Sequence, residues 1–273
     1  MGFAGWLKGL AVCGLGVLAA VVPGAMGTAE AACAFGLVQA PSLLRVAARF
    51  SAGAVPAGHV RIEFLGHSSF EIRTPEGVTV VTDYNGLNVP ASPPDAVTMN
   101  NSHETHYTDF PDPRIRFPLR GWRAGGGMAR HDITIGDLRI FSVPTNIGEY
   151  GDPESNGNSV FVFEVSGLCI AHVGHLHHVL TRDQILAIGR VDVLFMPVDG
   201  GLTMGHVEAL ENIRLIAPRL VIPMHFGFLG AADAFFELAR TRYTIRAERG
   251  SVLLVSRLTL PPATEIRFLQ GGQ

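Results

Sequence analysis

The alternation of apolar and polar side chains predicts that the folded part of the chain opens as a β-meander. Residues 60–64 and 69–73 alternate as half-buried strands do, and residues 78–82 are β-branched at every position. The turn residues 75–77 separate the last two of these strands. Residues 96–99 are mostly apolar, and we expect the next short strand there.

Two hairpins are expected in the middle of the chain. Residues 133–143 contain two apolar runs separated by a Gly-Asp pair, and residues 159–172 contain two separated by a Ser-Gly pair. The stretches 107–130 and 144–158 are rich in Gly, Pro and polar residues, so both are predicted to be loops.

The pattern then changes to alternating strands and helices. Thr181 and Gln184 have the spacing of a capping box, which indicates the start of a helix. The expected helices cover residues 181–188, 203–217 and 231–242, and the expected strands cover residues 191–198, 220–223 and 251–260. Two sheets packed back to back with helices outside accommodate both halves in one layered α/β domain.

The N-terminus is predicted to be a signal peptide of residues 1–31. Lys8 precedes an uncharged apolar stretch at residues 9–27, and small residues follow, so we expect cleavage after Ala31. The mature chain would then be exported to the periplasm or the extracellular space. The alternative is an uncleaved N-terminal anchor, which Pro23 and the many glycines of the stretch disfavour.

The remaining chain is interpreted as a leader and linker at residues 32–58, with a short helix expected at 41–50, and a folded domain at residues 59–273. Hydrophobic residues make up 47% of the chain and charged residues 16%, which is typical of a globular protein. A net charge of −3 gives no basic footprint for nucleic acid, and no membrane span is expected in the mature chain. The expected partner is a small-molecule substrate.

The chain has three cysteines, of which Cys13 lies in the predicted signal peptide. Cys33 and Cys169 remain, and an oxidising compartment would permit them to pair. The apolar run around Cys169 instead favours a plain buried thiol there. No pair of cysteines has zinc-binding spacing, so cysteine is not expected to hold a metal.

Histidines stand where predicted strands give way to loops, at His103, His106, His175 and His225. Loops at strand ends can bring distant parts of a sequence together. A single histidine in this position is usually a satisfied polar residue near a core. Four in the same context predict a metal site, since three or four neutral imidazoles around an open position suit catalytic zinc.

Several segments in order resemble the metallo-β-lactamase superfamily, and in particular its branch that includes the ascorbate-phosphate lactonases. They are Gly66–Phe70, the strand 78–82 ending in Asp83, the loop Asn101–His106, the run Cys169–His178 and the strand end Ile222–His225. The resemblance covers about residues 60–260. It implies an αββα sandwich of two mixed β-sheets flanked by helices, and a metal-dependent hydrolase.

The chain departs from the family's metal-binding pattern. Asn101 stands at the first histidine of the loop and Thr105 at its aspartate, while His175 stands at the bridging aspartate. Asn146 lies in the segment that would supply another histidine. We therefore expect one zinc ion, with another transition metal as the alternative. The expected ligands are His106, His175 and His225, with His103 as a fourth or outer group and His177 as a further candidate.

Carboxylates to orient the attacking water are expected at Asp83 and Asp199, because each follows a predicted strand; Glu104 and Glu149 are less well placed. For both aspartates the alternative is a local turn, in which the side chain bonds its own backbone. His67 is a candidate for lining the pocket, or its ring packs at the start of a strand.

Two functions follow from these residues. The first is an exported hydrolase, in which a zinc-bound hydroxide attacks a lactone, ester or phosphoester. The alternative is a non-catalytic binding or scaffold protein that keeps the fold with a degenerate metal site. The retention of imidazoles at the altered positions favours the hydrolase.

Overall fold

The computed structural model describes residues 1–2, 33, 42–44, 54–101, 103–149, 152–226 and 231–270. Nearly all of the predicted signal peptide, and the end of the helix expected at 41–50, lie outside these residues. No helix in the described part of the chain combines the length and apolar character needed to cross a membrane.

The first sheet has six strands in the order β14-β2-β3-β4-β5-β6. Its strands are β2 (His59–Gly66), β3 (Ser69–Arg73), β4 (Thr79–Val81), β5 (Ala96–Met99), β6 (Phe117–Arg120) and β14 (Val252–Ser256). The predicted antiparallel meander is confirmed for β2, β3 and β4, whereas β5 pairs in parallel with both β4 and β6. Strand β6 lies in the stretch 107–130, which was predicted as a loop. Its Pro118 argues against a strand in the sequence, but proline is tolerated in an edge strand such as β6.

The second sheet has nine strands in the order β1-β7-β8-β9-β10-β11-β12-β15-β13. Its strands are β1 (Ser42–Leu44), β7 (Asp132–Ile135), β8 (Leu138–Glu149), β9 (Asp152–Val165), β10 (Leu168–His172), β11 (Val193–Pro197), β12 (Leu220–Met224), β13 (Thr244–Ala247) and β15 (Glu265–Phe268). Strands β10, β11 and β12 are parallel neighbours, so their carboxyl ends meet at one edge. Strands β13 and β15 were not predicted, and the strand expected over 251–260 is β14 in the other sheet.

The loop predicted at 144–158 is wrong, because β8 and β9 continue through it as one long antiparallel hairpin. The ladder pairs Gly148 with Pro153. A register shift, as at a β-bulge, lies between Thr145 and Ile147. Pairing with the neighbouring strand therefore overrides the local turn preference of Gly and Pro.

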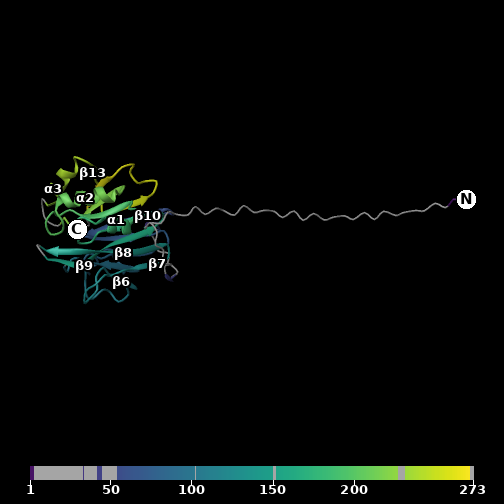
Figure 1. Cartoon of the computed structure of the whole chain (residues 1–273), viewed down its shortest axis with the longest axis horizontal. Coiled ribbons are helices and arrows are strands. Elements are labelled where there is room, and N and C mark those ends of the chain that lie inside the picture. The colour runs from purple at the N-terminus through teal and green to yellow at the C-terminus, as the bar shows by residue number, and fades with distance from the viewer. Residues whose placement is uncertain are drawn as a thin grey trace. The chain divides into compact units, whose positions relative to one another are not determined.

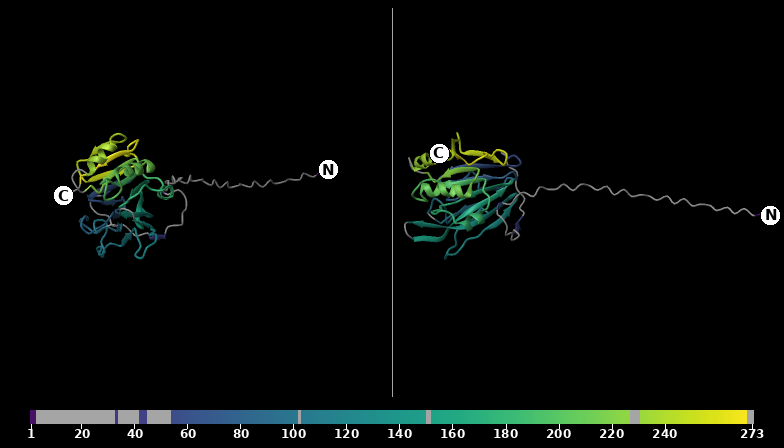
Figure 2. Two further views of the ribbon diagram at one scale, coloured as in Figure 1. Left: turned by 60° about the vertical axis from the view of Figure 1, so that its left-hand side comes forward. Right: turned by 45° about the horizontal axis from the view of Figure 1, so that its top comes forward.

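Three helices link the strands of the nine-stranded sheet in the described chain: α1 (Arg182–Ile188), α2 (His206–Ile216) and α3 (Ala231–Ala239). The predicted capping box is confirmed, since Thr181 accepts a hydrogen bond from the Gln184 backbone and Gln184 accepts one from the Thr181 backbone. Figure 1 shows α2 and α3 close to β13, and Figure 2 shows the green and yellow elements together at the top of both views.

The core lies between the two sheets. Phe70 of the six-stranded sheet stacks on Phe195 of the nine-stranded sheet, with ring centroids 4.1 Å apart and an interplanar angle of 10°. Both side chains are fully buried, and one continuous apolar cluster spans both sheets. This face-to-face packing of two mixed sheets confirms the expected layered fold.

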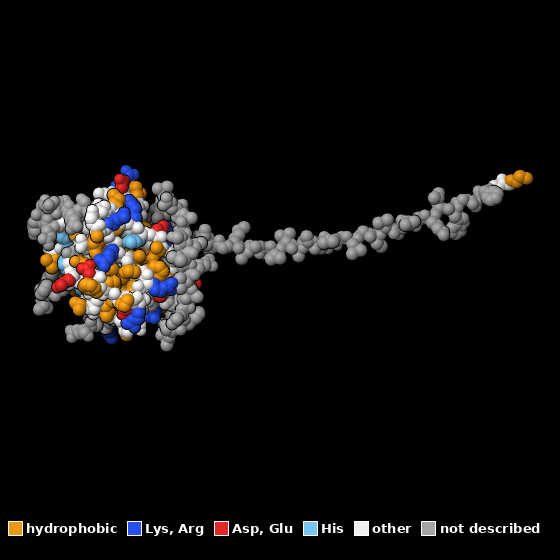
Figure 3. Space-filling model, turned by 90° about the horizontal axis from the view of Figure 1, so that it is seen from below, with side chains coloured by type: hydrophobic (Ala, Val, Ile, Leu, Met, Phe, Trp, Pro, Cys, Tyr) orange, Lys and Arg blue, Asp and Glu red, His pale blue; other side chains and the backbone are white. Residues whose placement is uncertain are grey.

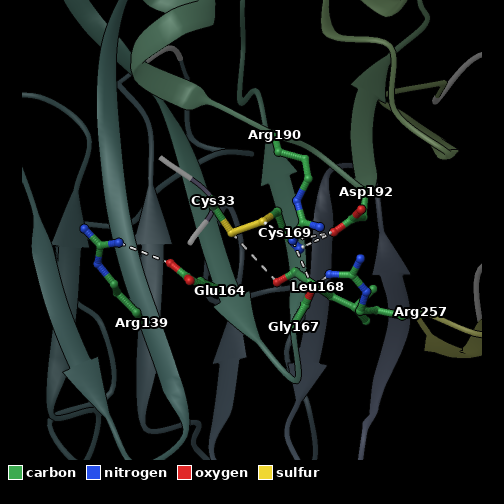
Figure 4. Close-up of a disulfide and its surroundings, with 9 residues drawn as sticks. All are labelled: Cys33, Arg139, Glu164, Gly167, Leu168, Cys169, Arg190, Asp192 and Arg257. Atoms are coloured by element: carbon green, nitrogen blue, oxygen red, sulfur yellow. Dashed lines mark hydrogen bonds and ion pairs between the residues drawn. A yellow bond between two sulfur atoms is a disulfide. The ribbon is translucent and has the colours of Figure 1, made fainter. Parts of the chain in front are cut away.

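Cys33 and Cys169 form a disulfide, which corrects the expectation of a plain buried thiol at Cys169. It joins a residue of the predicted leader to β10, with Cα atoms 5.6 Å apart. The Arg190 backbone N–H donates to the Cys33 carbonyl at 2.9 Å, and the Asp192 carboxylate accepts from the Cys169 backbone N–H at 2.8 Å. Figure 4 shows Arg190 and Asp192 beside the bridge.

The same leader contributes a strand. Ser42–Leu44, which lie inside the helix expected at 41–50, form β1 and pair in parallel with β7 at the edge of the nine-stranded sheet. Part of the stretch interpreted as leader and linker is thus built into the fold.

Candidate metal centre

Four histidines converge where strands of both sheets end. His103 and His106 follow β5 of the six-stranded sheet, while His175 follows β10 and His225 follows β12 of the nine-stranded sheet. One ligand atom from each lies within 4.8 Å of the others. His106, His175 and His225 are buried, and His103 is the most exposed of the four. The structure therefore brings together four of the five predicted metal ligands.

The Nε2 atoms face one another in pairs. His103 Nε2 lies 3.1 Å from His175 Nε2, and His106 Nε2 lies 3.1 Å from His225 Nε2. Tetrahedral zinc with Zn–N distances of about 2.0–2.1 Å holds neighbouring nitrogens about 3.3 Å apart. The two observed spacings fit one ion with four imidazole ligands.

Two carboxylates stand behind two of the rings. Asp83 Oδ2 accepts from His106 Nδ1 at 2.6 Å, and Asp199 Oδ2 lies 2.9 Å from His225 Nδ1. A carboxylate only accepts, so each neutral ring carries its proton on Nδ1 and a lone pair on Nε2. Two lone pairs then face each other across 3.1 Å with no proton between them. A bound cation satisfies both, and the residues present therefore fit a metal ion.

The other two rings also have partners on Nδ1. His177 Nε2 lies 2.9 Å from His175 Nδ1, and the Thr105 hydroxyl lies 2.7 Å from His103 Nδ1. The same hydroxyl lies 3.0 Å from His67 Nε2. Thr105, at the position of the family's aspartate, thus orients rings. His177, the fifth predicted ligand, therefore contacts the His175 ring and lies outside the group of four histidines.

The imidazoles of His67, His103 and His175 lie in an environment that favours their neutral form. Burial, followed by repulsion from His225 and His106, lowers the pKa of His67 to about 3. Burial and the same two neighbours lower the pKa of His103 to about 4. Burial and His106 also hold the pKa of His175 far below its usual range. Neutral imidazole is the form that binds a metal.

The two carboxylates are held ionised. Burial alone would raise the pKa of Asp83, but His172 and His106 together hold it below its usual value. Burial is likewise outweighed at Asp199, where hydrogen bonds from His225 and Thr203 lower the pKa. Two buried anions behind neutral ligands supply the negative charge that a dication needs.

Neighbouring polar side chains fix the aspartates. Asn100 Nδ2 donates to Asp83 Oδ1 at 3.1 Å. Asp199 Oδ1 accepts from the backbone N–H groups of Gly201, Leu202 and Thr203. The turn considered from sequence for Asp199 is therefore present, and its second oxygen contacts His225 in addition.

Backbone strain is concentrated at this site. His67, Asp83 and His225 adopt positive φ angles of 55°, 41° and 56°, a region that side-chain-bearing residues rarely occupy. The His225 N–H donates to the His67 carbonyl at 2.8 Å, which ties two of these residues together. The rings of His67 and His225 also lie close, with centroids 4.2 Å apart.

Asn100, Asn158 and Gly174 were not predicted from sequence. Asn158 Oδ1 accepts from the His175 N–H at 3.0 Å. Gly174 has φ +63°, and a Cβ there would collide with both Asn100 and Asn158. The one signal available was the glycine directly before His175, since only glycine fits this position. Asn146, at a family ligand position, instead accepts from the Asn156 backbone at 3.1 Å.

A cavity of about 520 Å³ opens beside this centre. His177 lines it, together with residues of the loop between β11 and α2 and with Gly148 of the long hairpin. Because His177 also contacts His175, the cavity adjoins the histidine cluster. Its volume suits a small molecule.

Comparisons with known proteins agree with this fold. A family model described as the beta-lactamase superfamily domain matches residues 61–225. A metal-dependent hydrolase of Thermococcus onnurineus is 24% identical over 189 residues, which cover 61% of this chain and 84% of the relative. A metal-dependent hydrolase of Myxococcus xanthus is 25% identical over 260 residues, which cover 80% and 92%.

Solved structures show the same architecture. A Thermotoga maritima protein, described as a candidate Zn-dependent hydrolase of the metallo-β-lactamase superfamily, superposes with a TM-score of 0.58 at 27% identity. The match covers 78% of this chain and all of that one, at 100%. Igni18, a metallo hydrolase from Ignicoccus hospitalis, superposes with a TM-score of 0.54 at 17% identity. Since the family model spans more than half of the sequence, this chain belongs to the metallo-β-lactamase superfamily.

Proposed function

We propose that this protein is a metal-dependent hydrolase that uses one zinc ion held by His106, His175, His225 and His103. The observation that carries the proposal is the pair of Nε2 lone pairs facing each other at 3.1 Å, with carboxylates behind both rings. The hydrolase names of the Thermococcus and Myxococcus relatives and of the Thermotoga structure support the same reaction class.

The reaction is hydrolysis of an ester-type bond in a small molecule. The oxygen of water forms a bond to the electrophilic carbon or phosphorus, the bond to the leaving oxygen breaks, and that oxygen takes up a proton. When bound, a zinc ion supplies Lewis acidity that activates water and polarises the substrate.

The chain's own residues bind the metal ion and orient its ligands. Asp83 and Asp199 are positioning residues, because each holds a histidine through Nδ1. Thr105 joins His103 to His67, which places the His67 ring beside the cluster as a group that lines the reaction site. Buried dipoles and charges of this kind need no rearrangement when the substrate binds.

We also propose that the mature protein is exported to the periplasm or the extracellular space. The predicted signal peptide supports this, and so does the disulfide between Cys33 and Cys169, since such bonds persist in oxidising compartments. On the face in Figure 3, Arg side chains are scattered among acidic and hydrophobic ones. The hydrolase names of the relatives support a small molecule as partner.

The test of the hydrolase proposal is a substrate panel. The zinc-loaded protein is expected to hydrolyse at least one of three chromogenic substrates, a 4-nitrophenyl ester, a chromogenic lactone and 4-nitrophenyl phosphate. Chelator should abolish the activity, and added zinc should restore it. A protein that binds zinc tightly yet hydrolyses none of them would point to the binding or scaffold function instead.

A second prediction concerns Asp83. Replacing it by asparagine is expected to weaken zinc binding about 10- to 100-fold, because Asn is uncharged and cannot accept from both His106 and Asn100. Competition against a chromophoric chelator measures the change in Kd. Asp112→Asn is the matched control, since Asp112 pairs with the exposed Arg114. An unchanged Kd in Asp83→Asn would mean that Asp83 does not position His106.

A further inference from the structure

The cavity beside the metal centre has a distinct chemical character. Its lining from the β11–α2 loop and the start of α2 includes Gly200, Leu202, Met204, Gly205 and Glu208. His177 lines the wall nearest the histidine cluster. A substrate with its reacting bond at the cluster therefore has this cavity available for the rest of the molecule.

The charge of the cavity disfavours anions. Among the described residues that line it, none is Lys or Arg, and the only ionisable side chains are His177 and Glu208. The Glu208 carboxylate lies against Gly205, the N-cap of α2, which has no side-chain cap of its own. A negative side chain thus already lies at the helix N-terminus, where an anionic group would otherwise be stabilised.

Apart from Thr203, whose hydroxyl donates to Asp199, the remaining lining is apolar or lacks side chains. Leu202 lines the cavity and is 62% exposed, so most of its apolar surface is open to water. Met204 is buried beneath the same loop and contributes an adaptable apolar surface. An alkyl chain that covered Leu202 would remove apolar surface from water and so favour binding.

We propose that the substrate is an uncharged carboxylic ester whose apolar acyl chain occupies this cavity, an inference that rests on the proposed hydrolase function. Water adds its oxygen to the ester carbonyl carbon, the bond from that carbon to the alkoxy oxygen breaks, and the alkoxy oxygen takes a proton. The products are a carboxylic acid, which loses a proton to solvent, and an alcohol. Esters whose acyl chain ends in a carboxylate are poor substrates, because Glu208 in the cavity lining repels that carboxylate.

The test compares two esters of equal length on the zinc-loaded protein. These are 4-nitrophenyl hexanoate and the 4-nitrophenyl monoester of adipic acid, which differ only in a terminal carboxylate. We expect kcat/KM for the hexanoate to exceed that for the adipate on the order of tenfold. In Glu208→Gln this ratio should fall towards one.

Glu211→Gln is the matched control, because Glu211 lies on the same helix, is paired with Arg214 and is absent from the cavity lining. It should keep the wild-type ratio. An adipate ester hydrolysed as well as the hexanoate, or a ratio that Glu208→Gln leaves unchanged, would overturn the proposal.

A binding measurement distinguishes failure of this proposal from failure of the hydrolase function. N-phenylhexanamide and its adipic counterpart resist hydrolysis, and titration calorimetry on the zinc-loaded protein gives both Kd values. Tighter binding of the hexanamide supports the assigned cavity even if no ester is hydrolysed, in which case only the hydrolase function fails. Equal or tighter binding of the carboxylate, or binding of neither compound, overturns the substrate class.

Discussion

His106→Ala combined with His225→Ala is expected to abolish zinc binding, from about one ion per chain in the native protein to none. The two rings provide the closest pair of buried Nε2 atoms, at 3.1 Å, and each is held by its own carboxylate. Removing both leaves two buried anions without their imidazole partners. Elemental analysis after dialysis against buffer free of metal measures the loss.

Two further variants keep this result interpretable. His106→Gln retains a polar side chain of similar size, so it tests metal loss where the alanine variant fails to fold. His59→Ala removes a histidine at the start of β2, whose ring nitrogen Nδ1 lies 3.1 Å from the Ala57 carbonyl oxygen, and it should keep the full metal content. Zinc retained in the double variant would show that the ion lies elsewhere.

Reduction of the disulfide is expected to lower the free energy of unfolding by roughly 3–5 kcal/mol. The bridge joins residues separated by 136 positions, so it closes a long loop in the unfolded chain and limits its conformational entropy. For a domain of this size, that corresponds to a fall in Tm of roughly 10 °C. Thermal unfolding of the protein with and without reductant measures the shift.

Cys33→Ser isolates the cause of that shift. The variant should unfold near the Tm of the reduced native protein, and reductant should have no further effect on it. A native Tm that does not respond to complete reduction, verified by thiol titration, would show that the closed loop contributes nothing to stability.

The ligands were predictable because their signal is local. An apolar run that gives way to a loop bearing histidine places the imidazole near the end of a strand: His225 follows β12 at once, His175 lies three residues after β10, and His106 lies seven residues after β5. The order of the segments along the chain then indicates the fold. Such patterns can be recognised in the sequence because the formation of a strand and the position of its end depend on adjacent residues.

The partners of the ligands were not predictable in the same way. Asp83 and His106 are 23 positions apart, and nothing in the sequence between them specifies that one carboxylate accepts from one ring. The same holds for the disulfide, whose apolar context at Cys169 resembles that of any buried thiol. These contacts depend on how the two sheets pack, which local pattern does not encode.

The long hairpin of β8 and β9 shows a second reason why parts of the fold could not be predicted. Pro144 and Pro153 are typical of loops, yet both lie inside β8 and β9. Their ladder pairs Pro144 with Ser159 and Gly148 with Pro153, so cross-strand partners decide the structure where single-residue preferences point to a turn.

The origin of the ligands in two different sheets has a thermodynamic consequence. An ion bound to His106 of one sheet and His225 of the other holds the two strand ends together, so metal occupancy and the docking of the sheets are linked equilibria. Free metal at a thousandfold excess over Kd would add about 4 kcal/mol to the stability of the folded state. Scarcity of zinc would then act on the lifetime of the protein as well as on its turnover, and the population of folded molecules would follow the metal supply of the compartment.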